Sequence, residues 1–164
     1  METIGRHRLV PESSRPIVVG IDGSEGARRA VEWAVDDAHR KGRTLRLIHA
    51  MDHREPYDLF GSPAAEWPHT LTRKGRRLLV EAERLARERR PDVEITSLLL
   101  EGDPGIVLRA QGRIAAEIVV GSRGLGGLTG AVLGSVSGQV AGQAHCPVVV
   151  VRPGSETVHD EVVV

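Results

Sequence analysis

The stretch Ile17-Val18-Val19-Gly20-Ile21-Asp22-Gly23-Ser24 decides the fold of this chain. Its apolar run shows no polar alternation, which is typical of a strand buried on both faces, and the run ends in a turn sequence. Ser24 can then cap a helix, because apolar residues follow at three- and four-residue steps over residues 27–38 and Gly42 stands where a C-terminal cap belongs. The stretch therefore predicts a buried strand followed by an amphipathic helix.

The same alternation of strand and helix continues along the chain. Further strands are predicted at residues 45–50, 93–100, 118–120 and 148–151, and further helices at 71–86, 106–114 and 135–144. Strands that alternate with helices are joined by right-handed crossovers into a parallel sheet with helices on both faces. The pattern predicts a single α/β domain built on an open, twisted, parallel five-stranded sheet.

Polar segments without periodicity flank this domain. Residues 1–15 and 154–164 are expected to be flexible tails, so the folded domain is expected to span residues 16–153. Residues 51–68 form a long predicted loop that contains the single Tyr, the single Phe and one of the two Trp. We interpret this loop as a candidate lid.

The charge balance and the cysteine content limit the classes of function. Lys and Arg together number 22, as do Asp and Glu, so the formal net charge is zero and predicts no attraction to nucleic acid or membrane. We interpret the charged run 73–90 as a solvated helix face, with nucleic-acid binding as the alternative. The single cysteine, Cys146, favours a reducing compartment, and residues 1–14 lack an apolar signal core. We therefore expect a cytoplasmic protein.

A glycine-rich segment, residues 120–137, leaves the tip of the fourth strand and enters the last helix. In doubly wound sheets, ligands bind beyond the strand tips where the strand order reverses. Gly121 and Gly124 are expected to adopt positive φ and to bring bare amides close to a ligand. The helix beginning at Ser135 adds free N–H groups, and Ser135 and Ser137 add hydroxyls. The segment predicts an anion cradle, with a purely structural corner as the alternative.

The spacing Gly121-x-x-Gly124, nine residues, Gly134-Ser135 resembles the G-2x-G-9x-G-[ST] motif of the ATP-binding universal stress proteins. The turn at residues 22–24 and the segment 146–153 also resemble that family, and the similarity covers about residues 16–153. Glu117 departs from the pattern, since an aspartate usually opens the fourth strand there. The resemblance implies the strand order 3-2-1-4-5, with an adenine nucleotide across the tips of the first and fourth strands.

The resemblance also implies which residues form the site. The adenosine would contact Gly20, Ile21, Asp22 and Ala50; the ribose and phosphates would contact Val120, Gly121, Ser122, Arg123 and Gly124; and the phosphates would be held by Gly134, Ser135, Val136 and Ser137. Mg²⁺ is expected to enter with ATP, because Arg123 is the only cation of the loop. The family further implies a homodimer through the apolar strand Val148–Val151, and a regulatory protein partner.

No catalytic residue is assigned. Asp22 could orient ribose, bind a metal through water or cap its turn, but no general base or activated nucleophile accompanies it. His49 and His53 have metal-ligand spacing only on a helix, and His49 falls in a predicted strand, so no metal site is assigned. We expect a stress-response sensor or regulator that binds ATP. The alternatives are a slow ATP hydrolase or adenylyl-handling enzyme, and a nucleotide-free dimeric interaction module.

Overall fold

The computed structural model describes residues 11–53, 67–125 and 133–154, with the backbone alone for residues 67 and 68. The elements are η1 (Glu12–Ser14), β1 (Ile17–Gly20), α1 (Glu25–Lys41), β2 (Leu45–Met51), α2 (Trp67–Arg89), β3 (Ile95–Glu101), α3 (Pro104–Gly112), β4 (Glu117–Gly121), α4 (Ser135–Gln143) and β5 (Val148–Val151). Every predicted strand and helix is present. Most of the candidate lid and of the two predicted tails lies outside the described residues, and the domain limits stay a prediction.

The five strands form one parallel sheet in the order β3-β2-β1-β4-β5. Val18 of β1 lies beside Arg46 of β2 on one side and Ile118 of β4 on the other. This order confirms the predicted fold class. The chain builds outward from β1 to β3 and then returns to β4, so the connections that leave β1 and β4 diverge and open a crevice at their carboxyl ends.

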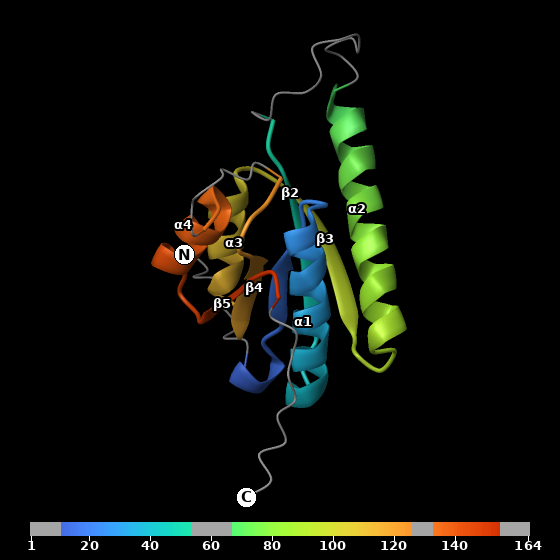
Figure 1. Cartoon of the computed structure of the whole chain (residues 1–164), viewed down its shortest axis with the longest axis vertical. Helices are drawn as coiled ribbons and strands as arrows, with labels where there is room; N and C mark the ends of the chain where they lie inside the picture. The colour runs from blue at the N-terminus through green and yellow to red at the C-terminus, as the bar shows by residue number, and fades with distance from the viewer. Residues whose placement is uncertain (1–10, 54–66, 126–132, 155–164) are drawn as a thin grey trace, which may run out of the picture.

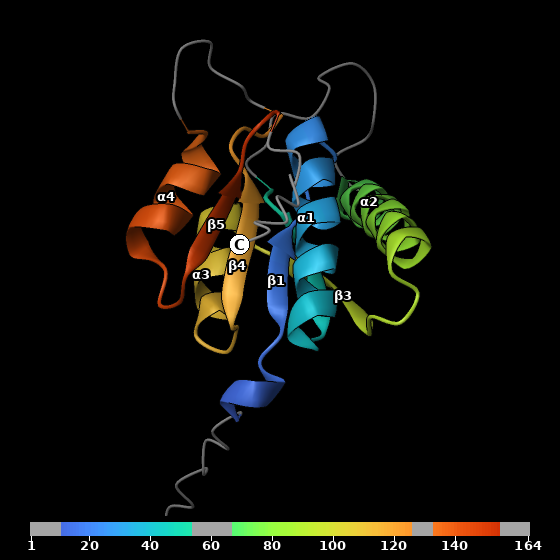
Figure 2. The same ribbon diagram turned by 60° about the horizontal axis from the view of Figure 1, so that its bottom comes forward.

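Helices cover both faces of the sheet, with α1 and α2 on one face and α3 and α4 on the other (Figures 1 and 2). Side chains alternate across a strand, so each face has its own apolar cluster. Under α1 and α2 the buried side chains include Ile17, Val19, Leu45, Leu47, Val31 and Val35; under α3 and α4 they include Val18, Ile48, Ile118, Val120, Leu108 and Val140.

The limits of α1 follow from its caps, as the sequence predicts. Ser24 Oγ accepts a hydrogen bond from the Ala27 N–H at 3.1 Å, which satisfies one of the free amides of the first turn. Gly42 adopts a left-handed φ of 61° and donates its N–H to the carbonyls of Ala38 and His39. The helix therefore begins directly after the β1 turn, at the edge of the crevice.

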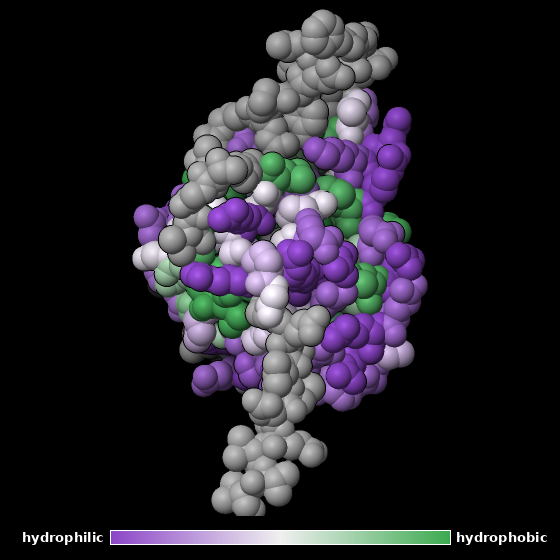
Figure 3. Space-filling view, viewed as in Figure 1, coloured by the Kyte–Doolittle hydropathy of each residue, from purple (hydrophilic) through white to green (hydrophobic). Residues whose placement is uncertain are grey.

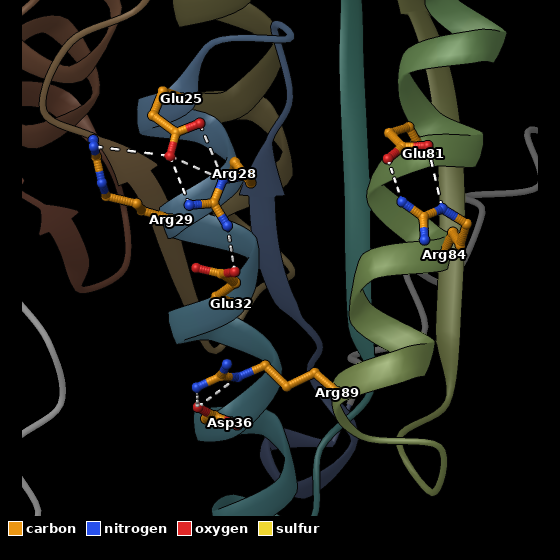
Figure 4. A network of polar contacts seen from close by, with 8 residues as sticks. All are labelled: Glu25, Arg28, Arg29, Glu32, Asp36, Glu81, Arg84 and Arg89. Carbon is orange, nitrogen blue, oxygen red and sulfur yellow. Dashed lines mark hydrogen bonds and ion pairs between the residues drawn. The ribbon is translucent and has the colours of Figure 1, made fainter.

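Ion pairs cover the outward faces of α1 and α2, which are mainly hydrophilic (Figure 3). Arg28 contacts Glu25 and Glu32 along α1 (Figure 4). Asp36 of α1 accepts hydrogen bonds from Arg89 at 2.7 and 2.9 Å and so joins α1 to α2. This arrangement is the one expected of solvated helix faces. None of the helices in the described part of the chain is both long and apolar enough to cross a membrane.

Candidate functional site

A cleft of about 270 Å³ opens at the carboxyl ends of β1, β2 and β4, where the strand order reverses. It brings together all but one of the residues predicted for the site. The predicted residues that line it are Gly20, Ile21, Asp22, Ala50, Val120, Gly121, Arg123, Gly124, Gly134, Ser135, Val136 and Ser137. The exception is Ser122, which is buried behind the loop and supports it, since its carbonyl accepts the Gly134 N–H at 2.7 Å.

Asp22 joins the β1 turn to the glycine-rich loop. Its Oδ1 accepts the Ser24 N–H at 2.9 Å, and its Oδ2 accepts the Leu125 N–H at 3.2 Å. Of the roles considered for this carboxylate, capping the turn is the one that the structure shows. The hydrogen bond from Leu125 gives Asp22 a second structural role, because it links the β1 turn to the glycine-rich loop across the cleft.

The predicted positive φ at Gly121 and Gly124 is wrong. Among the described residues only Gly23, Gly42, Gly102 and Gly154 have positive φ. The requirement for glycine here is one of space, because a Cβ on Gly121 would lie 2.5 Å from the backbone of Gly26 in the first turn of α1. A Cβ on Gly124 would likewise lie 2.5 Å from Asp22 Oδ2. These glycines let the loop pack against α1 and Asp22.

Unlike α1 and α3, helix α4 begins without a side-chain cap. Ser24 accepts the Ala27 N–H in α1, and Asp103 accepts the Ile106 N–H in α3, whereas the N-cap of α4 is Gly134. No side chain of the described residues therefore caps the first-turn amides of α4, which lie at the positive end of the helix dipole. Because the residues of this turn line the cleft, the arrangement favours an anion there.

The two serines of this turn differ in what they can donate. Ser135 is exposed, so its hydroxyl is accessible. Ser137 is 3% exposed, and its Oγ lies 3.1 Å from the Ser122 carbonyl and 3.2 Å from the Gly134 carbonyl. A hydroxyl carries one proton, and these carbonyls engage it. Ser137 is therefore able to offer its backbone amide to an anion, while its side chain secures the loop.

Two ionisable residues of the cleft, His49 and Lys74, are missing from the predicted site. His49 was weighed only as a metal ligand, although it directly precedes Ala50 near a strand tip. The Nδ1 atom of His49 lies 2.7 Å from the Ile21 carbonyl oxygen. The Nε2 atom of His53 lies 4.0 Å from Glu101 Oε2, so the two histidines have different neighbours. Lys74 was assigned to the charged run of α2, and no local pattern indicates that this helix reaches the cleft. It gives the cleft a second cation besides the loop arginine.

The opposite end of the sheet holds a buried acid pair. Glu117 and Asp37 are 7% and 2% exposed, and Lys41 Nζ lies 3.0 Å from Glu117 and 2.7 Å from Asp37. Burial, and then the hydrogen bond with Asp37, raise the pKa of Glu117. Burial alone would also raise the pKa of Asp37, but its hydrogen bonds with Glu117 and Lys41 lower it. Of the two carboxyl groups, Glu117 is therefore the one that takes up a proton more readily. Burial, with the charge of Glu117, also raises the pKa of Cys146, which keeps its thiol protonated.

The fold and the cleft together define an open-sheet α/β protein with a crevice at its switch point. The model of the universal stress protein family matches residues 13–152. The chain is 39% identical over 151 residues to a universal stress protein of Mycolicibacterium smegmatis, covering 91% of this chain and 49% of the relative. It is 38% identical over 139 residues to one of Mycobacterium tuberculosis, covering 84% and 45%. The chain belongs to the universal stress protein family and spans about half the length of these relatives.

A solved structure supports the same assignment. The crystal structure of a universal stress protein in complex with cAMP superposes with a TM-score of 0.63 at 27% sequence identity. The comparison covers 85% of this chain and 97% of that protein. The family predicted from the glycine spacing is therefore confirmed.

Proposed function

We propose that this chain binds an adenine nucleotide, and ATP in particular, in the cleft between the tips of β1 and β4. The observation that carries the proposal is the uncapped first turn of α4, which offers free amides and the positive end of a helix dipole to the cleft. The relative whose structure is described as a complex with cAMP, at 27% identity, supports an adenine nucleotide as the class of ligand.

The proposed orientation of the nucleotide follows from the order of the strands. The phosphates would lie at Gly134 and the first turn of α4, and the ribose beside Asp22 at the β1 turn. The base would lie near Ala50 on β2, because β2 is on the far side of β1 from β4. In this orientation the other predicted residues of the cleft contact the nucleotide as the family resemblance implies.

Mg²⁺ would enter with the triphosphate. In the described part of the chain, no three His, Cys, Asp or Glu side chains come together as metal ligands. Mg²⁺ is commonly held by phosphate oxygens, one or two carboxylates and water, so a nucleotide could carry most of its own metal ligands. Lys74 and Arg123 line the same cleft and would offset part of the remaining phosphate charge.

We further propose that nucleotide occupancy serves a stress-response sensor or regulator in the cytoplasm, without efficient turnover. Hydrolysis needs a base that positions water at the terminal phosphate. Both oxygens of Asp22 already accept hydrogen bonds from backbone N–H groups. His49 belongs to β2, at the end of the cleft proposed for the adenine ring and not for the phosphates. Slow hydrolysis remains the alternative. Release of phosphate that requires Mg²⁺ and disappears in Asp22→Ala would favour it.

Calorimetric titration of the nucleotide-stripped protein tests the proposal. We expect micromolar binding of Mg-ATP, weaker binding of Mg-GTP, and at least a tenfold loss in Gly124→Val, whose side chain would displace Asp22. Gly142→Val is the matched control, because a Cβ at Gly142 would meet no atom within 4 Å. If the unaltered protein binds neither nucleotide, the proposal fails and the nucleotide-free interaction module replaces it.

A further inference from the structure

The edge of the sheet at β3 differs from the edge at β5. Among the described strands β3 pairs with β2 alone, and its seven residues make it longer than the four-residue β5. Exposed edge strands are commonly protected by lysine, proline, a bulge or short length. β3 contains neither lysine nor proline, and Leu98, Leu99 and Leu100 follow one another in it. This edge is therefore long and apolar, and its sequence does little to protect it.

The backbone of β3 has free hydrogen-bonding groups along this edge. Toward β2, the Leu45 N–H donates to the Glu94 carbonyl at 2.9 Å, and the Gly102 N–H donates to the Met51 carbonyl at 3.0 Å. These two bonds assign the even-numbered residues of β3 to the ladder with β2. Because backbone groups alternate along a strand, the N–H and C=O groups of the odd-numbered residues face the free edge. In the described part of the chain no strand pairs with these groups.

The face of β3 toward α3 is incompletely covered. Helix α2 packs over the opposite face, whereas α3 packs over β1, β2 and β4. On the α3 side Thr96 is exposed, and Leu98 and Leu100 are only half-buried at the margin of the apolar cluster. Apolar side chains of a further strand could therefore pack beside these leucines.

A positive charge without an acidic partner lies next to this face. Arg46 of β2 is in register with Thr96, so the two side chains are neighbours on the same face. Arg46 is half-buried, and among the described residues its one hydrogen bond runs from Nη1 to Gln111 Oε1 of α3 at 3.4 Å. Its Nε is buried without a partner. A partly desolvated guanidinium is costly without an anion, so the face favours a carboxylate.

We propose that β3 accepts an extended segment of a partner protein as a further strand, with an acidic side chain beside Thr96 and an apolar one beside Leu98. Strand addition of this kind takes affinity from backbone hydrogen bonds and specificity from alternate side chains. Neighbouring strands lie about 4.8 Å apart, so the backbone beside Thr96 would be about 10 Å from that of Arg46. An arginine and a glutamate side chain together span this distance.

A second copy of this chain fits this edge less well than a different protein. If copies pair through β5, as the family resemblance implies, further copies that pair through β3 would join the dimers into an open-ended chain. Closed assemblies are the rule among soluble oligomers. The edge at β3 is thus better suited to a different partner that carries an acidic, extended segment.

A synthetic peptide tests the proposal. The blocked peptide Thr-Leu-Thr-Glu-Thr-Leu-Thr has the same side-chain order in both directions, so either orientation places its glutamate beside Thr96 and a leucine beside Leu98. In NMR titrations of the whole chain at low salt, it should bind about three- to tenfold tighter than the same peptide with glutamine at the centre.

Two variants separate the role of Arg46 from that of overall charge. In Arg46→Met the glutamate and glutamine peptides should bind equally within error, because the partner of the carboxylate is gone. Arg113→Met is the matched control, since it removes an exposed positive charge at the C-cap of α3 and should keep the difference between the peptides. Similar melting temperatures would show that both variants fold.

Hydrogen exchange shows where the peptide binds. The amides of Ser97, Leu99 and Glu101 should exchange more slowly in the complex, whereas those of Leu98 and Leu100, already bonded to β2, should not change. The proposal is overturned if neither peptide binds, if both bind the unaltered protein equally, or if the odd-numbered amides stay unprotected. Protection of the same amides that grows with protein concentration in the absence of peptide would overturn it in favour of a second copy.

Discussion

At the scale of the residue, the cleft depends on glycines whose role can be recognised only in the folded structure. Gly26 and Gly121 are far apart in sequence, yet a Cβ on Gly121 would lie 2.5 Å from the carbonyl carbon of Gly26. Their approach sets the first turn of α1 against the tip of β4, and a Cβ on Gly26 would strike the Arg123 carbonyl. The shape of the cleft between β1 and β4 thus depends on the absence of side chains at Gly26 and Gly121. It also depends on the Asp22 carboxylate, which joins the β1 turn to the glycine-rich loop.

The raised pKa of the buried Glu117 leads to a prediction about how the stability of the folded protein depends on pH. Its pKa is raised in the folded protein, so the native state holds this proton more tightly than the unfolded chain does. Its contribution to stability is therefore fully present below the ordinary glutamate pKa of about 4.3 and is lost as the pH rises through the raised value. Glu117→Gln keeps a donor for Asp37 and cannot ionise.

We expect Glu117→Gln to match the unaltered protein near pH 4 and to be more stable at pH 8, by on the order of 1 kcal/mol. Urea unfolding across this range measures the difference between the two proteins, and ionisable groups that do not contact Glu117 largely cancel. A difference that does not change with pH would show that folding leaves the pKa of Glu117 unchanged and would contradict the prediction.

At the scale of the element, α4 differs from α1 and α3 in that its N-cap makes no side-chain hydrogen bond. An N-cap side chain stabilises a helix by about 1 kcal/mol relative to alanine and by about a few tenths of that relative to glycine; α1 and α3 have such a side chain, whereas the N-cap of α4 is Gly134. The φ of Gly134 is −68°, and a Cβ there would approach Ser137 Oγ no closer than 3.4 Å, so other residues can stand at this position. The missing cap is therefore not forced by the backbone, and a ligand is the natural acceptor for these amides.

Gly134→Asp tests this interpretation by supplying the missing cap. The carboxylate should accept an N–H of the first turn and stabilise the helix by roughly 0.5–1 kcal/mol. The same change should weaken ATP binding at least tenfold, because it places a negative charge where the phosphates would lie. Gly134→Ala, measured beside it by thermal unfolding and calorimetry, separates the effect of charge from that of an added Cβ. Undiminished ATP affinity in Gly134→Asp would place the phosphates elsewhere.

The elements also show what the sequence could and could not predict. β1 was found from its continuous apolar run, because a strand buried on both faces leaves that signature locally. β5 was found from a similar run of valines, although most of its residues are only partly buried. The sequence predicted the loop that carries Gly121 and Gly124, but it did not predict why glycine is needed there. The close approach of this loop to α1 cannot be read from the spacing of the glycines in the sequence. Lys74 was missed for the same cause: its role depends on how α2 packs across the sheet.

At the scale of the whole molecule, β5 lies at an edge of the described sheet, and its four valines bear on assembly. Carbonyls of Pro147 and Val151 accept hydrogen bonds from the β4 side. Because backbone groups alternate along a strand, the N–H groups of Val148 and Val150 face the free edge. Among the described strands β5 pairs with β4 alone. We propose that a second copy of this chain covers this edge.

Sedimentation velocity should then show a species of twice the 17.7 kDa chain mass. Val148→Pro should shift it to the monomer, because the change removes an N–H that the sheet itself does not use, at the first residue of the strand. Val148→Ala should remain dimeric, and similar melting temperatures would show that both variants fold. A monomer at all concentrations of the unaltered protein would contradict this interface.

The central claim is that an adenine nucleotide spans the cleft from β2 to α4. The most direct test is a crystal structure of the protein with Mg²⁺ and a non-hydrolysable ATP analogue. We predict phosphate oxygens within hydrogen-bond distance of the amides of Ser135, Val136 and Ser137, and the base beside His49 and Ala50. A nucleotide bound elsewhere, or a cleft that stays empty at saturating ligand, would contradict the account.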